Sequence, residues 1–212
     1  MSNFLFDGPS DAKVTILLAH GAGVPMDTAS MSAFAQALAF AGLRVARFEF
    51  DYMAARRVSA ARRPPPLAEK LMAEYCHAVD ELKASGPLII GGKSMGGRVA
   101  SMVADELFVA KRISGLLCLG YPFHPTGKPQ QLRTAHLANL KAPTLIVQGT
   151  RDPFGTRDEV ESYDLAGTIE LLWLEDGDHD LKPRKSISGL SLADHMDILG
   201  TEVSIWADRI TQ

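Results

Sequence analysis

The sequence contains little cysteine, no excess of basic residues and no hydrophobic run long enough to cross a bilayer. Of its 212 residues only two are cysteines, Cys76 in a helical pattern and Cys118 in an apolar, strand-like run. We expect two buried thiols rather than a disulfide, because cysteine in such surroundings usually behaves as a small apolar side chain. The net charge of −3 gives no indication of a nucleic-acid partner, which would favour a basic surface.

Signals for export and for metal binding are also absent. Residues 1–7 contain no basic stretch followed by an apolar segment, so we expect a cytoplasmic protein without a membrane partner. No histidine, cysteine or acidic cluster has the spacing of metal ligands, and we expect a reaction without metal or other cofactor. The length and the 46% hydrophobic content fit one domain over residues 1–212, whose oligomeric state the sequence leaves open.

Strand-like and helix-like segments alternate along the chain. Six short apolar runs predict strands at 14–19, 44–50, 87–90, 116–119, 144–147 and 169–174. Amphipathic helical patterns lie between most of them, and Thr156 with Glu159 fits a capping box for a helix that runs toward Tyr163. This alternation predicts the α/β class, with a mostly parallel sheet covered by helices on both faces.

In parallel α/β sheets, ligand sites lie beyond the carboxyl ends of the strands. Residues 92–96, Gly-Lys-Ser-Met-Gly, match the pattern G-x-S-x-G between a predicted strand and a predicted helix. The glycines allow a sharp turn that lifts the hydroxyl of Ser94 out of the sheet, and the N–H of Met95 can then face an oxyanion. A glycine-rich turn without chemistry is the alternative, so the assignment of Ser94 as nucleophile depends on its partners.

A serine nucleophile needs a base, and the sequence offers one after its last predicted strand. His179 is predicted to be this general base, and Asp152, which follows the strand 144–147, is predicted to orient it. The order serine, acid, histidine along the chain is the one that this arrangement requires. Asp152 could instead cap a helix, although Thr156 can fill that role. Asp178 is a competing acid, but it directly precedes the histidine and is badly placed to reach its Nδ1.

The strand-end segments resemble those of the α/β-hydrolase superfamily over nearly the whole chain; they read LLAHGAG, GGKSMGGR, GYPFHPTGKP, QGTRDPFG and DGDHDLKPRK. They look most similar to small, capless, dienelactone-hydrolase-like forms, including bacterial predicted hydrolases and relatives of the testis-expressed and NSL-complex-subunit proteins. The resemblance implies a single-domain α/β-hydrolase fold without a large cap. It also implies a Ser-His-Asp triad, with the N–H of Ala22 as the second donor of an oxyanion hole. The implied function is hydrolysis of an ester, thioester or lactone through an acyl-enzyme, with the substrate left open.

Two other functions compete with this interpretation. Gly92-Lys93-Ser94 imitates the end of a phosphate-binding P-loop, but the first glycine of that motif is replaced by Pro87, and apolar residues fill the rest of the loop. The second alternative is a catalytically silent α/β-hydrolase-fold interaction module, since a fold alone does not establish activity. The presence of all three triad residue types argues against that module.

Several polar side chains are candidates for substrate binding. Arg56, Arg57, Arg62 and Arg63 follow the second predicted strand, and we expect Arg56 and Arg57 to bind an anionic group of a small-molecule substrate. A solvated basic loop is the alternative. His124 follows the fourth predicted strand and is predicted to line the same pocket, with a loop-capping role as its alternative.

Overall fold

Seven strands form the central sheet of the computed structural model, which describes residues 3–58 and 64–212. They are β1 (Leu5–Asp7), β2 (Thr15–Ala19), β3 (Arg44–Phe48), β4 (Leu88–Lys93), β5 (Gly115–Leu119), β6 (Thr144–Gly149) and β7 (Ile169–Leu174). Their order is β1-β3-β2-β4-β5-β6-β7, and only β1 runs antiparallel to its neighbour. The six predicted strands are therefore confirmed, and β1 is an additional edge strand.

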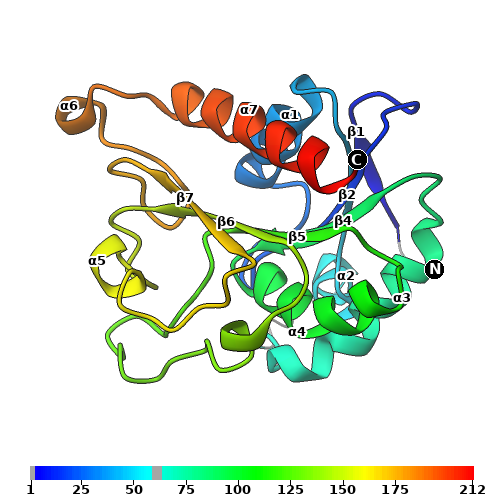
Figure 1. Ribbon diagram of the computed structural model, residues 1–212, viewed down its shortest axis with the longest axis horizontal. Helices are drawn as coiled ribbons and strands as arrows, with labels where there is room; N and C mark the ends of the chain where they lie inside the picture. Colours follow the sequence, from blue (N-terminus) through cyan, green and yellow to red (C-terminus); the bar gives the residue numbers. More distant parts are fainter. Residues whose placement is uncertain (1–2, 59–63) are drawn as a thin grey trace.

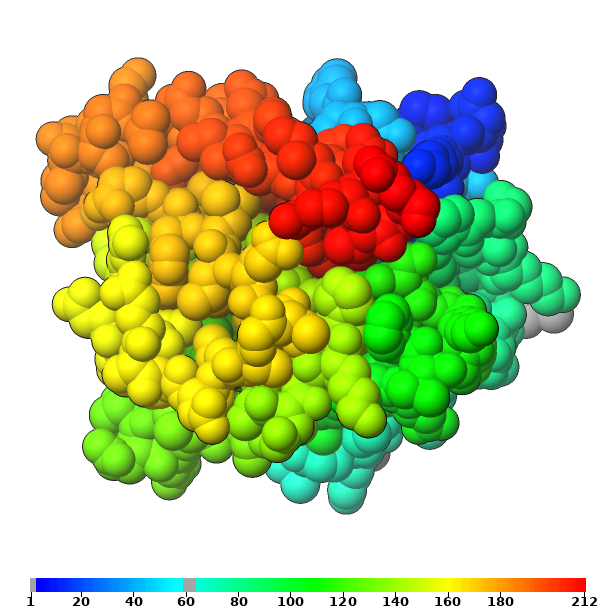
Figure 2. Space-filling model, in the orientation of Figure 1, coloured from blue at the N-terminus to red at the C-terminus, as the bar shows by residue number. Residues whose placement is uncertain are grey.

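Helices cover both faces of this sheet (Figure 1). One face carries α1 (Ala29–Phe40) and α7 (Leu192–Ile210), and the other carries η1 (Ala68–Leu71), α3 (Met72–Leu82) and α4 (Met95–Val109). The remaining helical segments are short: α2 (Asp51–Val58), η2 (Leu137–Asn139), α5 (Arg157–Val160) and α6 (Lys185–Ser188). Figure 2 shows α7, in orange to red, lying along the upper part of the surface in this view.

Strand β2 shows how one sequence run serves two hydrophobic cores. All five of its residues are buried. Successive side chains of a strand point to opposite faces, so Leu17 and Ala19 pack in the core under α3 and α4. Ile16 and Leu18 pack in the core under α1 and α7. A strand buried on both faces reads as a continuous apolar run, which is why the sequence located it.

The segment after β3 differs from the prediction. The strand ends at Phe48 rather than at residue 50, and residues 51–58 form helix α2 instead of a loop. Arg56 and Arg57 belong to this helix, whereas Arg62 and Arg63 lie outside the described residues.

The predicted capping box is present but begins a shorter helix than expected. Thr156 and Glu159 pair at the start of α5, where the N–H of Thr156 donates to the Glu159 carboxylate at 2.8 Å. The helix ends at Val160 rather than continuing to Tyr163.

Both cysteines are free, with Cys118 buried and Cys76 half-buried. Among the described helices, none combines the length and the hydropathy that a bilayer span needs.

Candidate active site

Ser94 lies on a strained turn between β4, which ends at Lys93, and α4, which begins at Met95. Its backbone has φ 52° and ψ −115°, in the left-handed half of the Ramachandran plot that non-glycine residues rarely adopt. Gly92 and Gly96 make the turn possible. A Cβ at either position would lie within 2.6 Å of the Ala19 carbonyl oxygen, because the end of β2 passes directly beside them.

A continuous chain of hydrogen bonds links Ser94 to His179 and Asp152. His179 Nε2 lies 2.9 Å from Ser94 Oγ, and His179 Nδ1 lies 2.8 Å from Asp152 Oδ2. An ionised carboxylate only accepts hydrogen bonds, so Nδ1 carries the proton and Nε2 is left to accept from the serine hydroxyl. The imidazole also packs on the ring of Phe154, with the ring centroids 4.3 Å apart. The structure thus brings together the three residues predicted from separate strand ends.

The Asp152 carboxylate is fully buried and accepts several hydrogen bonds. Besides His179, its Oδ2 accepts from Gln148 Nε2 at 2.9 Å, and its Oδ1 accepts from the Phe154 N–H at 2.9 Å. Asp178, the competing acid, has a different role. Its Oδ1 accepts from the N–H groups of Asp180 and Lys182 and so closes the turn that follows His179.

Lys93, the residue before Ser94, is a buried lysine close to the acids of this site. The side chain is almost completely buried, and its Nζ lies 3.5 Å from Asp180 Oδ1. Burial lowers the pKa of Lys93, while the nearby charges of Asp180 and Asp152 act in the opposite direction. In its charged form Lys93 is attracted to both of these carboxylates.

Gln148 is a site residue that the sequence analysis missed. Its Oε1 accepts from the Tyr121 N–H at 2.7 Å, and its Nε2 donates to Asp152 and to the Tyr121 carbonyl oxygen. It therefore ties the end of β6 to the loop that follows β5. A polar residue in an otherwise apolar strand, here TLIVQG, was the available signal, since buried amides are almost always hydrogen-bonded.

We expect Gln148→Leu to lower the free energy of unfolding by at least about 2 kcal/mol, because several buried polar groups would lose their partner. Thermal or urea unfolding measures this loss. Gln130→Leu is the matched control, because Gln130 is exposed, and it should change stability by less than about 0.5 kcal/mol. Equal effects of the two substitutions would show that the Gln148 hydrogen bonds do not stabilise the fold.

The two predicted oxyanion donors both border the cavity beside Ser94. Met95 is the first residue of α4, so its N–H belongs to the helix-terminal groups that have no acceptor within the helix. Ala22 lies in the loop after β2, and its carbonyl oxygen accepts from Tyr52 Oη at 3.0 Å. Both residues line the same cavity as Ser94, which has a volume of about 350 Å³.

His20 fixes the loop that carries Ala22, a role that the sequence analysis did not assign. Its Nε2 accepts from the Phe50 N–H at 3.3 Å, so its Nδ1 carries the proton and donates to the Gly21 carbonyl oxygen at 2.6 Å. The side chain is fully buried, and this burial lowers the pKa of His20, so the neutral ring is favoured. A neutral, doubly bonded imidazole holds the loop after β2 against the end of β3.

Three predicted substrate-binding residues are not among those that line this cavity. The Arg57 guanidinium is paired with Asp27 at 2.8 Å and with Glu49 at 2.6 Å, so its donors already have acceptors. The Arg56 guanidinium lies over the ring of Tyr52, 5.2 Å from its centroid. Residues 51–58 are helical, and Tyr52, Asp27 and Glu49 are not among the residues that line this cavity, so anion binding by Arg56 and Arg57 stays a prediction.

His124 is buried in the loop after β5 instead of lining the cavity. Its Nδ1 lies 3.0 Å from the Pro125 carbonyl oxygen, and its Nε2 lies 3.6 Å from Glu159 Oε1. These contacts agree with the alternative that the sequence left open, in which the residue stabilises its own loop.

A second serine–histidine pair joins α4 to the residue before η2: Ser101 Oγ and His136 Nε2 are 2.8 Å apart. Ser101 is 2% exposed, and its hydroxyl donates to the Arg98 carbonyl oxygen at 2.7 Å. Since the hydroxyl proton is used in that bond, His136 Nε2 acts as the donor to Oγ and cannot take a proton from it. This pair has the geometry of a helix-packing contact rather than of an activated nucleophile.

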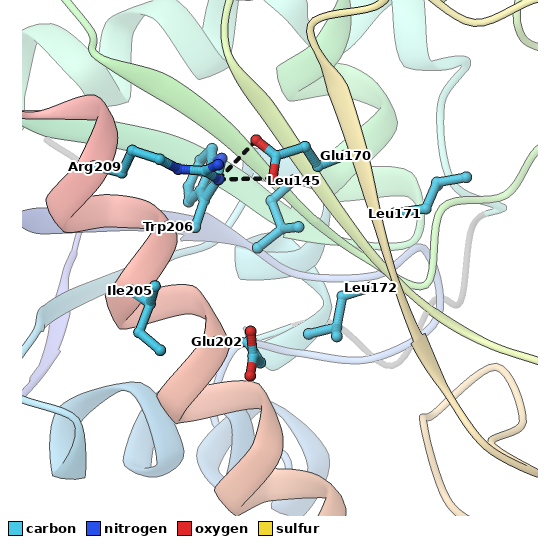
Figure 3. A pocket seen from close by; sticks show the side chains of 8 residues that line it. All are labelled: Leu145, Glu170, Leu171, Leu172, Glu202, Ile205, Trp206 and Arg209. Carbon is cyan, nitrogen blue, oxygen red and sulfur yellow. Dashed lines mark hydrogen bonds and ion pairs between the residues drawn. The ribbon is translucent and has the colours of Figure 1, made fainter.

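Another hollow, of about 340 Å³, lies between α7 and strands β6 and β7 (Figure 3). Arg209 and Glu170 form an ion pair at 2.7 Å on its border. Leu145, from the beginning of β6, lines this hollow, whereas Asp152 follows the end of that strand. The described residues that line this hollow include no serine, cysteine or histidine, so it holds no second serine–histidine or cysteine–histidine pair.

Strand β4, which runs from Leu88 to Lys93, argues against the P-loop alternative. Those residues are the ones that a P-loop would use to cradle a phosphate, and here they are a buried central strand. The parallel sheet, the turn at Ser94 and the histidine loop after β7 define the α/β-hydrolase class of folds.

The chain belongs to the family of alpha/beta hydrolase domains, whose model matches residues 12–208. It is 28% identical over 149 residues to the "Putative protein-lysine deacylase ABHD14B" of Pongo abelii, an alignment that spans 70% of this chain and 66% of that protein.

Among solved structures, the chain resembles the dienelactone hydrolase of Anabaena variabilis, with a TM-score of 0.72, 19% identity and coverage of 99% and 92% of the two chains. It also resembles XC6422 of Xanthomonas campestris, described as a serine hydrolase without a lid, with a TM-score of 0.68, 19% identity and coverage of 97% and 89%. The predicted superfamily and the capless form of the fold are confirmed.

Proposed function

We propose that this protein is a serine hydrolase that cleaves an ester, thioester or lactone, with Ser94 as nucleophile, His179 as general base and Asp152 as its orienting acid. The observation that supports it most is the unbroken path from Ser94 Oγ through His179 to Asp152, with bonds of 2.9 Å and 2.8 Å. These are the distances at which a base can take the proton of a nucleophile.

In the proposed reaction, Ser94 Oγ attacks the carbonyl carbon of the substrate while His179 Nε2 takes the hydroxyl proton. The carbonyl oxygen gains negative charge and is bound by the N–H groups of Met95 and Ala22. His179 then gives its proton to the leaving oxygen or sulfur, which leaves an acyl group on Ser94. A water molecule, deprotonated by His179, attacks this acyl group, and His179 returns the proton to Ser94 Oγ as the acid is released. Asp152 remains ionised throughout and stabilises the imidazolium.

Labelling with a fluorophosphonate probe tests this proposal, because the reagent forms a covalent bond only with an activated serine. We expect the native protein to be labelled and Ser94→Ala to be unlabelled. Ser101→Ala is the matched control, since Ser101 also contacts a histidine, and it should be labelled like the native protein.

Absence of labelling in the folded native protein would favour the catalytically silent interaction module. Labelling that survives in Ser94→Ala but is lost in Ser101→Ala would identify Ser101, in α4, as the nucleophile.

A further inference from the structure

Two arginines are among the described residues that line the cavity beside Ser94, and none of those described residues is acidic. Arg98 lies one turn along α4 from Ser94, and its N–H donates to the Ser94 carbonyl oxygen at 3.0 Å. Side chains of a helix lean toward its N-terminus, so that of Arg98 leans toward the Ser94 end of α4. Arg133 lines the same cavity from the loop after β5.

The backbone of Arg133 is fixed on both sides. Its N–H donates to the Phe123 carbonyl oxygen at 2.7 Å, and its own carbonyl oxygen accepts from Tyr121 Oη at 3.0 Å. Burial lowers the pKa of Arg133, and the positive charge of Arg98 lowers it further. Two neighbouring, half-buried cations repel each other, and a bound anion would relieve that repulsion.

Arg98 is only partly paired. One terminal nitrogen of its guanidinium donates to Glu69 Oε1 at 2.8 Å, while its Nε is buried and has no hydrogen-bond partner among the described residues. Glu69 is about half exposed, with 52% of its side-chain surface accessible. A guanidinium can bind a carboxylate through two parallel N–H groups, and Glu69 uses only one of those available. The Glu69 contact demonstrates that a carboxylate fits at Arg98, and it leaves donors for another.

We propose that Arg98 and Arg133 bind a carboxylate at the far end of the substrate's acyl chain. This inference rests on the proposed function, because it places the carboxylate relative to a carbonyl held at Ser94. Ser94 and both arginines line one cavity of about 350 Å³, so the acyl group between the carbonyl and the carboxylate must be short enough to fit inside it. The preferred substrates are esters or thioesters of short dicarboxylic acids, and Glu69 competes with their free carboxylate.

The test compares two esters with acyl chains of equal length, the neutral 4-nitrophenyl hexanoate and the acidic 4-nitrophenyl hydrogen adipate. Arg98→Met and Arg133→Met should each lower kcat/KM for the acidic ester by about 10- to 100-fold, the effect expected for loss of a charge-assisted hydrogen bond. Both should leave hydrolysis of the neutral ester near its native value. Glu69→Gln should instead improve binding of the acidic ester and lower its KM, because it removes the carboxylate that competes for Arg98. It should leave KM for the neutral ester unchanged.

Arg112→Met is the matched control, because Arg112 also pairs with one carboxylate, that of Asp80, but is not among the residues that line the cavity. It should leave the ratio of the two activities unchanged. If the native protein hydrolyses both esters and neither cavity substitution alters that ratio, the carboxylate site is refuted while the hydrolase proposal stands. If the folded native protein hydrolyses no ester, thioester or lactone, the proposed function itself fails. Should Arg98→Met not fold, Arg133→Met and Glu69→Gln decide the question.

Discussion

Ser94→Ala is expected to lower ester hydrolysis by about four to six orders of magnitude, the loss found when a triad nucleophile is removed. Without Oγ no acyl-enzyme can form, and only the oxyanion donors and substrate binding remain to promote attack by water. The substitution should not unfold the protein, since it removes one oxygen atom at a half-buried turn. Steady-state hydrolysis of 4-nitrophenyl esters, beside circular dichroism of the same sample, provides the measurement.

Ser101→Ala is the matched control for Ser94→Ala, because Ser101 also contacts a histidine. Its side chain is buried inside α4, so its loss should alter stability more than turnover. Native turnover by Ser94→Ala on every substrate that the protein hydrolyses would refute Ser94 as the nucleophile.

His179→Ala is expected to be almost as damaging, because Ser94 would lose the base that takes its proton. The double variant Ser94→Ala/His179→Ala should be no slower than the worse of the two single variants, since the two groups act as one unit. Single-turnover and steady-state rates of all three variants measure this non-additivity.

His136→Ala provides the histidine control, as its ring also contacts a serine. We expect it to retain most of the native turnover. If the rate losses of Ser94→Ala and His179→Ala multiplied in the double variant, the two residues would act independently and the proposed relay of the proton would be wrong.

The sequence predicted those parts of the fold and site that depend on local patterns. Strand β7 was placed at its exact bounds, because its apolar run ends at turn residues on both sides. Ser94, Asp152 and His179 were identified from strand-end positions, and a parallel sheet brings such positions to one edge whatever the intervening helices contain. Strand β1, with three residues, was too short to give a pattern.

Contacts that depend on tertiary packing could not be read from the sequence. The Arg57 side chain is held by Asp27 and Glu49, from a loop and a strand end that the sequence does not place beside residue 57. Arg98 lies two residues after the serine motif, at a position that carries no local signal for a binding role. Tertiary packing brings Arg133, from a distant loop, to the cavity that Arg98 lines.

The wide separation of Ser94 and His179 along the chain also has a consequence for how activity appears during folding. The two residues whose atoms lie 2.9 Å apart are 85 positions apart in sequence, and β5, β6 and β7 must all join the sheet before they meet. Parallel pairings of this kind close long loops and form slowly, so a partly folded chain can bury much of its core and still lack a functional serine. Recovery of hydrolysis after dilution from denaturant therefore reports completion of the last strands, whereas recovery of helical signal reports earlier events.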